Sequence, residues 1–312
     1  METIRRAVID VGTNSVKLLV AEVAGRCVTP LLEESRQTRL GKDFYETHRL
    51  QPEAITRTAG AVAALADRAR ALQPASLRVI ATSAARDAQN PDELVAAILA
   101  AAGLRVEIIS GEQEAEWAFQ GVTTEARFAV GSLLILDVGG GSTEFILGCG
   151  SRRLFARSFS LGTVRLLEKF PHGDPPTAAE WTACRDWLRA FLEDQVRSLL
   201  EPVLKSGDLS GPVRLAGTGG TATLLGRMDR QLEHFDRAAI ESVQLSREHL
   251  QTLRARLWSL PLAQRQRVPG LPPSRADVIL TGVAIYAAVM ERFDLPLLSL
   301  STRGLRFAAV ME

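Results

Sequence analysis

The chain has 312 residues, of which 46% are hydrophobic and 23% charged, and its formal net charge is +1. This length favours two domains with sizeable cores, and the near-neutral charge argues against a protein that binds nucleic acid or an acidic membrane over its whole surface. The three cysteines are scattered without metal-ligand spacing, and no apolar run has the length of a membrane span. The first residues lack the apolar run of a signal peptide, so we expect a cytoplasmic protein.

The first predicted element is a β-hairpin that carries an acid. Residues 7–11 are an apolar run interrupted only by Asp10, and a second apolar run follows over residues 16–23 with Lys17 near its start. A short polar turn joins them, formed by Gly12, Thr13, Asn14 and Ser15. We predict two antiparallel strands, with the turn at their tip.

Helices and strands then alternate. We predict a helix over 58–72, a strand over 77–82, a helix from Pro91 to Ala102 with Asn90 as its N-cap and Gly103 as its C-cap, a strand over 104–109, and a helix that Ser110 starts. This order predicts an α/β fold with a mixed sheet. Arg86 follows the strand at 77–82, where ligand-facing loops leave an open α/β sheet, although a solvated surface arginine is equally consistent with this position.

The hairpin pattern returns in the second half. An apolar strand over 133–137 ends in Asp137, three glycines follow, and a second strand over 143–148 carries Glu144 at its start. The repeat of Asp-Val-Gly at 10–12 and 137–139 indicates two related halves. We place the domain boundary between them, at 1–126 and 127–312, with the C-terminal helix near 303–312 packing back on the first domain.

The remaining predicted elements are mostly helical. Thr177 and Glu180 have the spacing of a capping box, and one long helix is expected to run from there to Leu199. A strand over 213–216 leads into a third Gly-rich turn at 217–221, which contains Gly217 and Gly219. A Pro-rich segment with Arg275 precedes an apolar helix that ends near Phe293, and a last strand over 297–301 precedes a short terminal helix.

The three Gly-rich turns suggest phosphate binding, because glycines let backbone N–H groups come close to an anionic oxygen. None of them has the P-loop or the dinucleotide-binding pattern. Two of them carry an acid at the strand end, so Mg²⁺ held by carboxylates and substrate phosphates would fit between them. Glu114 is the candidate base and Glu144 a second carboxylate, although an acid in the first turn of a helix is also favoured by the helix dipole alone. Ordinary Gly-rich hairpins remain the alternative explanation of the turns.

Three further motifs narrow this interpretation. They are Thr82-Ser-Ala-Ala-Arg86-Asp-Ala-Gln-Asn90, Ser110-Gly-Glu-Gln-Glu114-Ala and Pro269-Gly-Leu-Pro-Pro-Ser-Arg275-Ala-Asp277. With the two hairpins, they resemble the exopolyphosphatase and guanosine pentaphosphate phosphatase (Ppx/GppA) family in its short two-domain form. The resemblance implies two actin-like (ribonuclease-H-like) domains of the actin, Hsp70 and sugar-kinase superfamily, with an active site in the cleft between them.

The resemblance also implies roles for individual residues. Glu114 matches the catalytic base, with Glu144 as a second catalytic carboxylate. Asp10, Asp137 and Glu144 match positions associated with Mg²⁺, with Mn²⁺ as an alternative. The residues expected to bind phosphate are Gly12, Thr13, Asn14, Ser15, Lys17, Arg86, Gly139, Gly140, Gly141, Ser142, Thr143, Gly217, Gly219 and Arg275.

The expected activity is release of terminal orthophosphate from inorganic polyphosphate. The same residues would serve removal of the 5′-terminal phosphate of guanosine pentaphosphate, which is the alternative. A sugar or acetate kinase on the same scaffold and a nucleotide-gated binding module of the actin or Hsp70 type are the other hypotheses. The family resemblance further suggests a homodimer.

Overall fold

The computed structural model describes residues 2–312 and divides the chain into two compact units. Unit 1 contains the described residues up to Thr124 together with Arg303–Glu312, and unit 2 is Glu125–Thr302. Each unit is built on one mixed β-sheet with helices against it, which is the expected α/β architecture. None of the helices formed by residues 2–312 is both long and apolar enough to cross a membrane.

The sheet of unit 1 has five strands in the order β3-β2-β1-β4-β5. Strand β1 is antiparallel to β2 and parallel to β4, so the predicted hairpin forms the centre of the sheet. Strand β3 was not predicted, because its sequence of mixed polar and apolar residues lacks a clear apolar run. The strands are β1 Ile4–Val11, β2 Ser15–Ala24, β3 Cys27–Gln37, β4 Ser76–Ala81 and β5 Val106–Ile108.

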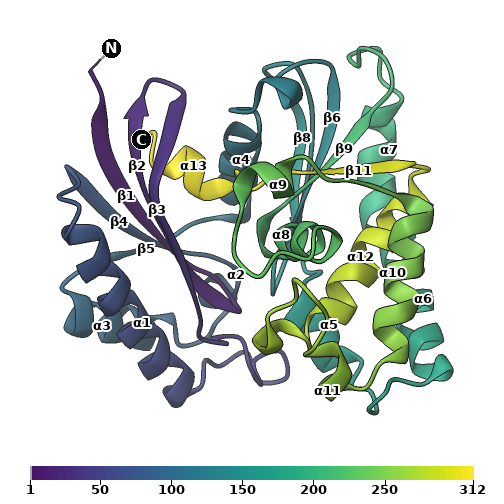
Figure 1. Ribbon diagram of the computed structural model, residues 1–312, viewed down its shortest axis with the longest axis horizontal. Helices are drawn as coiled ribbons and strands as arrows, with labels where there is room; N and C mark the ends of the chain where they lie inside the picture. Colours follow the sequence, from purple (N-terminus) through teal and green to yellow (C-terminus); the bar gives the residue numbers. More distant parts are fainter. Residues whose placement is uncertain (1) are drawn as a thin grey trace. The chain divides into compact units, whose positions relative to one another are not determined.

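Helices cover both faces of this sheet (Figure 1). Alternate side chains of β1 point to opposite faces, and Ile9 packs in the core beneath α1 and α3 while Val8 packs beneath α4 and α13. Asp10 follows the alternation and therefore shares the face of Val8. The helices are α1 Pro52–Arg70, α2 Ser83–Arg86, α3 Pro91–Ala102, α4 Gly111–Val122 and α13 Leu305–Ala309.

Both expected cap residues of α3 are confirmed in position. Gly103 ends the helix in the left-handed conformation, with φ of 66°. Asn90 stands at the predicted N-cap position, although its side chain makes no capping hydrogen bond. Its amide instead accepts from the backbone N–H of Leu50 at 2.8 Å and donates to the Leu50 carbonyl at 3.1 Å. The side chain thus satisfies a distant buried segment, because two backbone groups there need partners more than the helix end does.

The sheet of unit 2 has six strands in the order β10-β11-β9-β6-β7-β8. Strand β6 is antiparallel to β7 and parallel to β9, which repeats the arrangement of β1, β2 and β4 in unit 1. The repeat inferred from Asp-Val-Gly is therefore a repeat of topology. The strands are β6 Ser132–Val138, β7 Thr143–Cys149, β8 Arg152–Phe159, β9 Arg214–Thr218, β10 Gln244–Ser246 and β11 Leu297–Leu300.

Helices α6, α10 and α12 lie side by side in unit 2 (Figure 1). The long helix expected from Thr177 to Leu199 is interrupted: α6 begins with the predicted capping box, and a π-helical segment, Leu192–Arg197, separates it from α7. The helices are α5 Thr163–Lys169, α6 Ala178–Phe191, α7 Ser198–Leu204, α8 Gly219–Asp229, α9 Arg237–Glu241, α10 Arg247–Ser259, α11 Leu262–Arg265 and α12 Ile279–Arg292. Short 3₁₀ turns occupy Ala126–Phe128 and Pro273–Arg275.

Two further departures concern the segments that follow strands. Residues 83–86, expected to be a loop, form the single-turn helix α2. The Gly-rich segment 217–221, expected to be a turn, is a direct junction between β9 and α8, because Gly217 is still in the strand and Gly219 is the first helical residue. Gly219 has a φ of 81°, which allows the abrupt change of direction.

The C-terminal helix α13 packs against α4 within unit 1. A Cβ atom on Gly121 of α4 would lie 2.2 Å from the Gly304 carbonyl oxygen just before α13. No real side chain tolerates that distance, so the close approach of these two segments depends on the absence of a side chain at Gly121.

We predict that Gly121→Ala lowers the free energy of unfolding by about 1–3 kcal/mol, because the added methyl group must push α13 away from α4. Gly60→Ala is the matched control, since Gly60 also lies inside a helix but an added Cβ meets nothing within 4 Å. The control should gain about 0.5–1 kcal/mol from helix propensity. Urea unfolding monitored by circular dichroism measures both changes, and equal stability of the two variants would contradict the packing argument.

Candidate active site

The loop that joins β1 to β2 is held by its backbone. The N–H of Gly12 donates to the Ser15 carbonyl at 3.1 Å, which closes the turn. The carbonyl of Thr13 accepts from the N–H of Gly41 at 2.8 Å, and that of Asn14 accepts from the N–H groups of residues 38 and 39 at 3.2 and 3.0 Å. In a trans peptide the C=O and the following N–H point in opposite directions. The N–H groups of Asn14 and Ser15 are therefore turned away from the segment 38–41.

The loop that joins β6 to β7 uses the same device. The N–H of Gly139 donates to the Ser142 carbonyl at 3.0 Å, as Gly12 does to Ser15. The carbonyls of Gly139 and Gly140 accept from the first N–H groups of α5 at 2.9 and 2.8 Å, and that of Gly141 accepts from Nε of Arg165 at 2.9 Å. The N–H groups of residues 140–142 are thereby turned away from α5. Such rows of oriented N–H groups are suited to bind anionic oxygens.

Gly162 allows α5 to come this close to the loop. A Cβ atom there would lie 2.4 Å from the Gly140 carbonyl oxygen. The loop is also fixed from β7 and α12, because the Thr143 hydroxyl donates to the Leu161 carbonyl and the Thr281 hydroxyl donates to the Thr163 carbonyl. The hydroxyl of Thr143, which was predicted to bind phosphate, therefore donates its proton to a hydrogen bond within the protein.

Asp10 is a buried carboxylate in unit 1. Its side chain is 6% exposed, and Oδ1 has no hydrogen-bond partner among residues 2–312. Burial raises the pKa of Asp10, while the positive charges of Lys17 and Arg306 act to lower it. Lys17 lies directly opposite on β2. A buried carboxylate oxygen without a hydrogen-bond partner is suited to ligate a cation, so Asp10 fits the predicted metal role.

Asp137 and Glu144 form the corresponding pair in unit 2. They are directly opposite each other on β6 and β7, so their side chains leave the same face of the sheet. Both are buried, and Oε1 of Glu144 accepts from the hydroxyls of Ser142 at 2.8 Å and Ser158 at 2.7 Å. A Cβ atom on Gly219 would lie 2.0 Å from Oδ1 of Asp137, so only glycine fits beside this acid.

Two further buried hydroxyls lack a partner at the ends of the central strands. Oγ of Ser83 lies just past the end of β4, and Oγ1 of Thr218 is at the end of β9, opposite Asp137 in the register. Neither has a hydrogen-bond partner within residues 2–312. Both hydroxyls lie in strand-end positions where a phosphate or a metal-bound water would satisfy them.

Glu114 and Arg86 are brought together in unit 1. Glu114 lies in the first turn of α4, whose N-cap Ser110 accepts from the N–H of Gln113. Its Oε2 is 3.0 Å from Nη1 of Arg86, which also donates to the Ile109 carbonyl at 3.1 Å. Glu114 is only 6% exposed, unlike its exposed neighbour Glu112. A first-turn acid that served only the helix dipole would have no reason to be buried against an arginine.

The remaining residues predicted to bind phosphate include Gly217 and Arg275, which lie in unit 2 and differ in their surroundings. Gly217 is inside β9, where a Cβ atom would meet the Tyr286 hydroxyl at 2.9 Å, so packing explains this glycine. Arg275 ends a 3₁₀ turn and is half-buried. The fully buried Arg265 supports that turn by donating from Nε to the Ala276 carbonyl at 3.0 Å.

No group of three or more His, Cys, Asp or Glu side chains gathers closely enough to hold a metal ion by itself among the described residues. Any divalent cation must therefore take part of its coordination from water and substrate oxygens, which is the usual behaviour of Mg²⁺.

Several residues near the two Gly-rich loops and their acids were not predicted from the sequence. They are Ser83, Ser158, Arg165, Thr218 and Arg306. Thr218 stands inside a motif that was recognised, so its position was a usable signal. Arg165 and Arg306 carry no local signal, because the loop carbonyl and the acid that they approach are distant in sequence.

Comparisons with known proteins identify the family of the chain. The model of the Ppx/GppA phosphatase family matches residues 19–311. Exopolyphosphatase 2 of two Mycobacterium tuberculosis strains, CDC 1551 / Oshkosh and ATCC 25618 / H37Rv, is 36% identical over 294 residues, which cover 91% of this chain and 89% of the relative.

Solved structures extend the similarity to the fold. The Ppx/GppA family member of Aquifex aeolicus superposes with a TM-score of 0.79 at 28% identity, over 99% of this chain and 97% of that one. An exopolyphosphatase from Cytophaga hutchinsonii ATCC 33406 gives a TM-score of 0.85 at 26% identity, over 97% and 96% of the two chains. The resemblance drawn from the motifs is confirmed, and the chain belongs to the Ppx/GppA phosphatase family.

Proposed function

We propose that the chain is an exopolyphosphatase that releases terminal orthophosphate from inorganic polyphosphate. The observation that carries the proposal is the buried Glu114, held by Arg86 at the start of α4. The relative named exopolyphosphatase 2 supports the substrate class. A homodimer and a cytoplasmic location are further proposals that rest on the family alone.

The proposed reaction is in-line hydrolysis of the terminal phosphoanhydride. Glu114 accepts a proton from a water molecule, whose oxygen forms a bond to the terminal phosphorus. The bond from that phosphorus to the bridging oxygen breaks, and the shortened chain leaves with the electron pair. Arg86 holds Glu114 in position through their ion pair, and Arg86 and Arg275 offset the charge of the phosphoryl oxygens.

The two loops bind the chain by their oriented N–H groups. We assign this role to Asn14 and Ser15 in unit 1 and to residues 140–142 in unit 2, and we leave Gly217 out because it packs against Tyr286. We assign divalent-cation ligation to Asp10 in unit 1 and to Asp137 and Glu144 in unit 2, each considered by itself, with Mg²⁺ proposed and Mn²⁺ as the alternative. The bound cation supplies Lewis-acid stabilisation of phosphate charge. Asp10 fits this role by its orphaned oxygen, and the pair in unit 2 by its shared face.

We predict that Glu114→Gln lowers kcat for phosphate release by about 10²–10⁴-fold, because the amide cannot accept the proton, while polyphosphate binding changes little. Glu112→Gln is the matched control from the same helix turn, and it should retain turnover within about twofold. Initial rates of phosphate release and a filter-binding assay measure the two effects. Near wild-type turnover of Glu114→Gln would refute the assigned base.

We predict that Asp10→Asn abolishes the Mg²⁺-dependent rise in the midpoint of thermal unfolding. In EDTA the variant should be at least as stable as the wild type, because a neutral amide costs less to bury than a carboxylate. Thermal unfolding at neutral pH with EDTA and with Mg²⁺ measures this without any turnover. A full Mg²⁺ shift in the variant would exclude Asp10 as a ligand.

We predict that inorganic polyphosphate is hydrolysed with a higher kcat/KM than guanosine pentaphosphate. One preparation assayed for phosphate release from both substrates, and from short and long polyphosphates, tests this. A higher kcat/KM for guanosine pentaphosphate would replace the proposed substrate while leaving the chemistry intact.

A further inference from the structure

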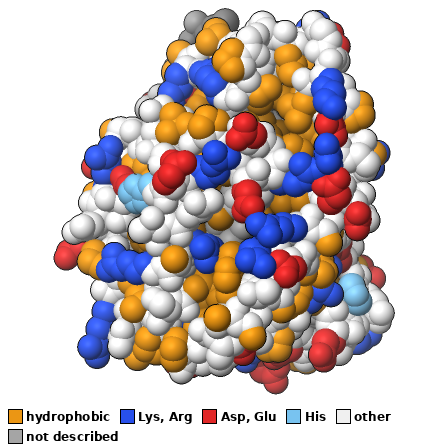
Figure 2. All heavy atoms as spheres, turned by 90° about the vertical axis from the view of Figure 1, so that its right-hand side faces the viewer, with side chains coloured by type: hydrophobic (Ala, Val, Ile, Leu, Met, Phe, Trp, Pro, Cys, Tyr) orange, Lys and Arg blue, Asp and Glu red, His pale blue; other side chains and the backbone are white. Residues whose placement is uncertain are grey.

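A groove of about 580 Å³ lies between α6, α10 and α12 of unit 2, and no residue of the β6–β7 loop lines it. Four arginines, Arg185, Arg189, Arg247 and Arg254, line it, against two carboxylates, Glu248 and Glu291. Figure 2 shows the face of the molecule on the right of Figure 1, where Lys and Arg side chains alternate with carboxylates and with exposed apolar side chains. Among the residues that line the groove, arginines outnumber carboxylates.

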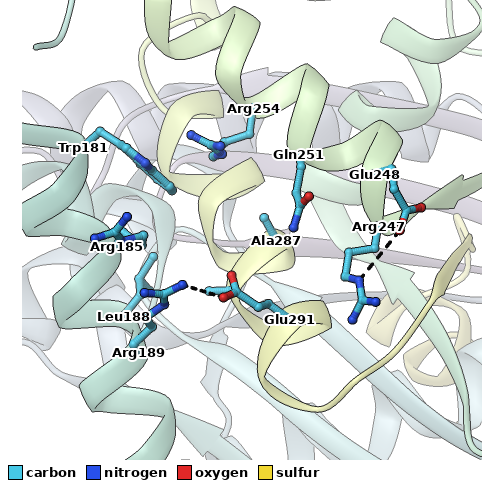
Figure 3. A pocket seen from close by; sticks show the side chains of 11 residues that line it. Trp181, Arg185, Leu188, Arg189, Arg247, Glu248, Gln251, Arg254, Ala287 and Glu291 are labelled. Atoms are coloured by element: carbon cyan, nitrogen blue, oxygen red, sulfur yellow. Dashed lines mark hydrogen bonds and ion pairs between the residues drawn. The ribbon is translucent and has the colours of Figure 1, made fainter. Parts of the chain in front are cut away.

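The arginines of the groove differ in their ion-pair partners. Arg189 pairs with Glu291, Arg247 pairs with Asp294 at 2.8 Å, and Arg185 pairs with its exposed neighbour Asp186 at 2.8 Å. Arg254 has no ion pair with any described residue. Its guanidinium instead lies 4.1 Å from the centre of the Trp181 ring, and Figure 3 shows the two side chains at the same end of the groove.

This position is costly for a cation. Arg254 is half-buried, and burial lowers the pKa of its guanidinium. The charge of Arg185 lowers that pKa further, while Glu291 acts in the opposite sense. Two guanidinium groups that repel each other beside an aromatic wall are stabilised when an anion with several oxygens lies between them. Within residues 2–312, Glu291 is the carboxylate that acts on Arg254, and it is paired with Arg189.

The groove is distinct from the candidate active site, although both use α12. Near its start this helix contacts the loop region, through the Thr281 hydroxyl and through Gly282, which packs against Thr163. Glu291 lines the groove nine residues after Gly282, which is about two and a half turns further along the helix.

We propose that this groove is a second oxyanion site, which binds a phosphate group through Arg254 and Arg185 with Trp181 as its wall. The planar guanidinium fork matches the oxygens of a phosphate, and an exposed, half-polar groove suits a small hydrated anion better than an apolar ligand. Free orthophosphate and the end of a short polyphosphate present the same oxygens. The site does not depend on the proposed hydrolysis, and its test requires no turnover.

The test is a fluorescence titration of the full chain in EDTA, at an ionic strength held constant with chloride. Orthophosphate and tripolyphosphate are titrated separately, and the part of the response that Trp181→Phe removes is assigned to Trp181. We expect a saturable change that is lost in that variant. Isothermal calorimetry on the same variants provides a readout that does not depend on the indole.

Arg254→Gln should raise the half-saturating concentration at least tenfold. Arg256→Gln is the matched control, because Arg256 is exposed on the same helix and does not line the groove, and it should change the value less than twofold. Saturation by orthophosphate identifies the free anion as a ligand, and saturation by tripolyphosphate alone identifies the chain end. Equal responses of Arg254→Gln and the wild type, or no saturation with either anion, would overturn the proposal.

Discussion

The direction of a few peptide groups is the constraint on which the rest of this structure depends. In each Gly-rich loop the carbonyls are bound by a neighbouring segment, residues 38–41 in unit 1 and the start of α5 in unit 2. The planar peptide then turns the following N–H groups the other way. The central strands, the close approach of Gly162 and the hydroxyls of Thr143 and Thr281 all serve to hold this orientation. If the loops bind phosphate as proposed, their N–H groups are oriented before the anion arrives, which lowers the free-energy cost of binding it.

A second feature of the molecule is that each unit buries carboxylates at positions where their burial lowers the stability of the fold. Asp10 has an unpartnered oxygen and a raised pKa, and Asp137 and Glu144 stand side by side on one sheet face. Two adjacent carboxylates and a desolvated one each cost stability in the absence of a counter-charge. Such a cost is tolerated at sites that act on a ligand, so the same residues that destabilise the empty protein indicate what it binds.

Much of the fold was predictable because its signals are local. The two hairpins follow from apolar runs with an acid and glycines between them, and the caps at Gly103 and Thr177 follow from residue preferences within one turn. Strand β3 and the π-helical break after α6 were missed, because neither has an apolar pattern of its own. Asn90 is the N-cap as predicted, but its side-chain amide bonds to the backbone of a residue forty positions away, which its local sequence does not indicate.

The sequence by itself determined the repeated strand-turn-strand units, the family and the residue types at the loops, because each of these depends on neighbours along the chain. Only the tertiary structure decided which charges meet. Arg86 reaches Glu114, Arg165 reaches the Gly141 carbonyl, and Arg306 from the last helix acts on Asp10 near the first turn. It also left Arg254 without an ion pair to any residue of 2–312, in a groove that three helices build. Electrostatic interactions act through space rather than along the chain, and the packing of helices on the sheets sets those distances.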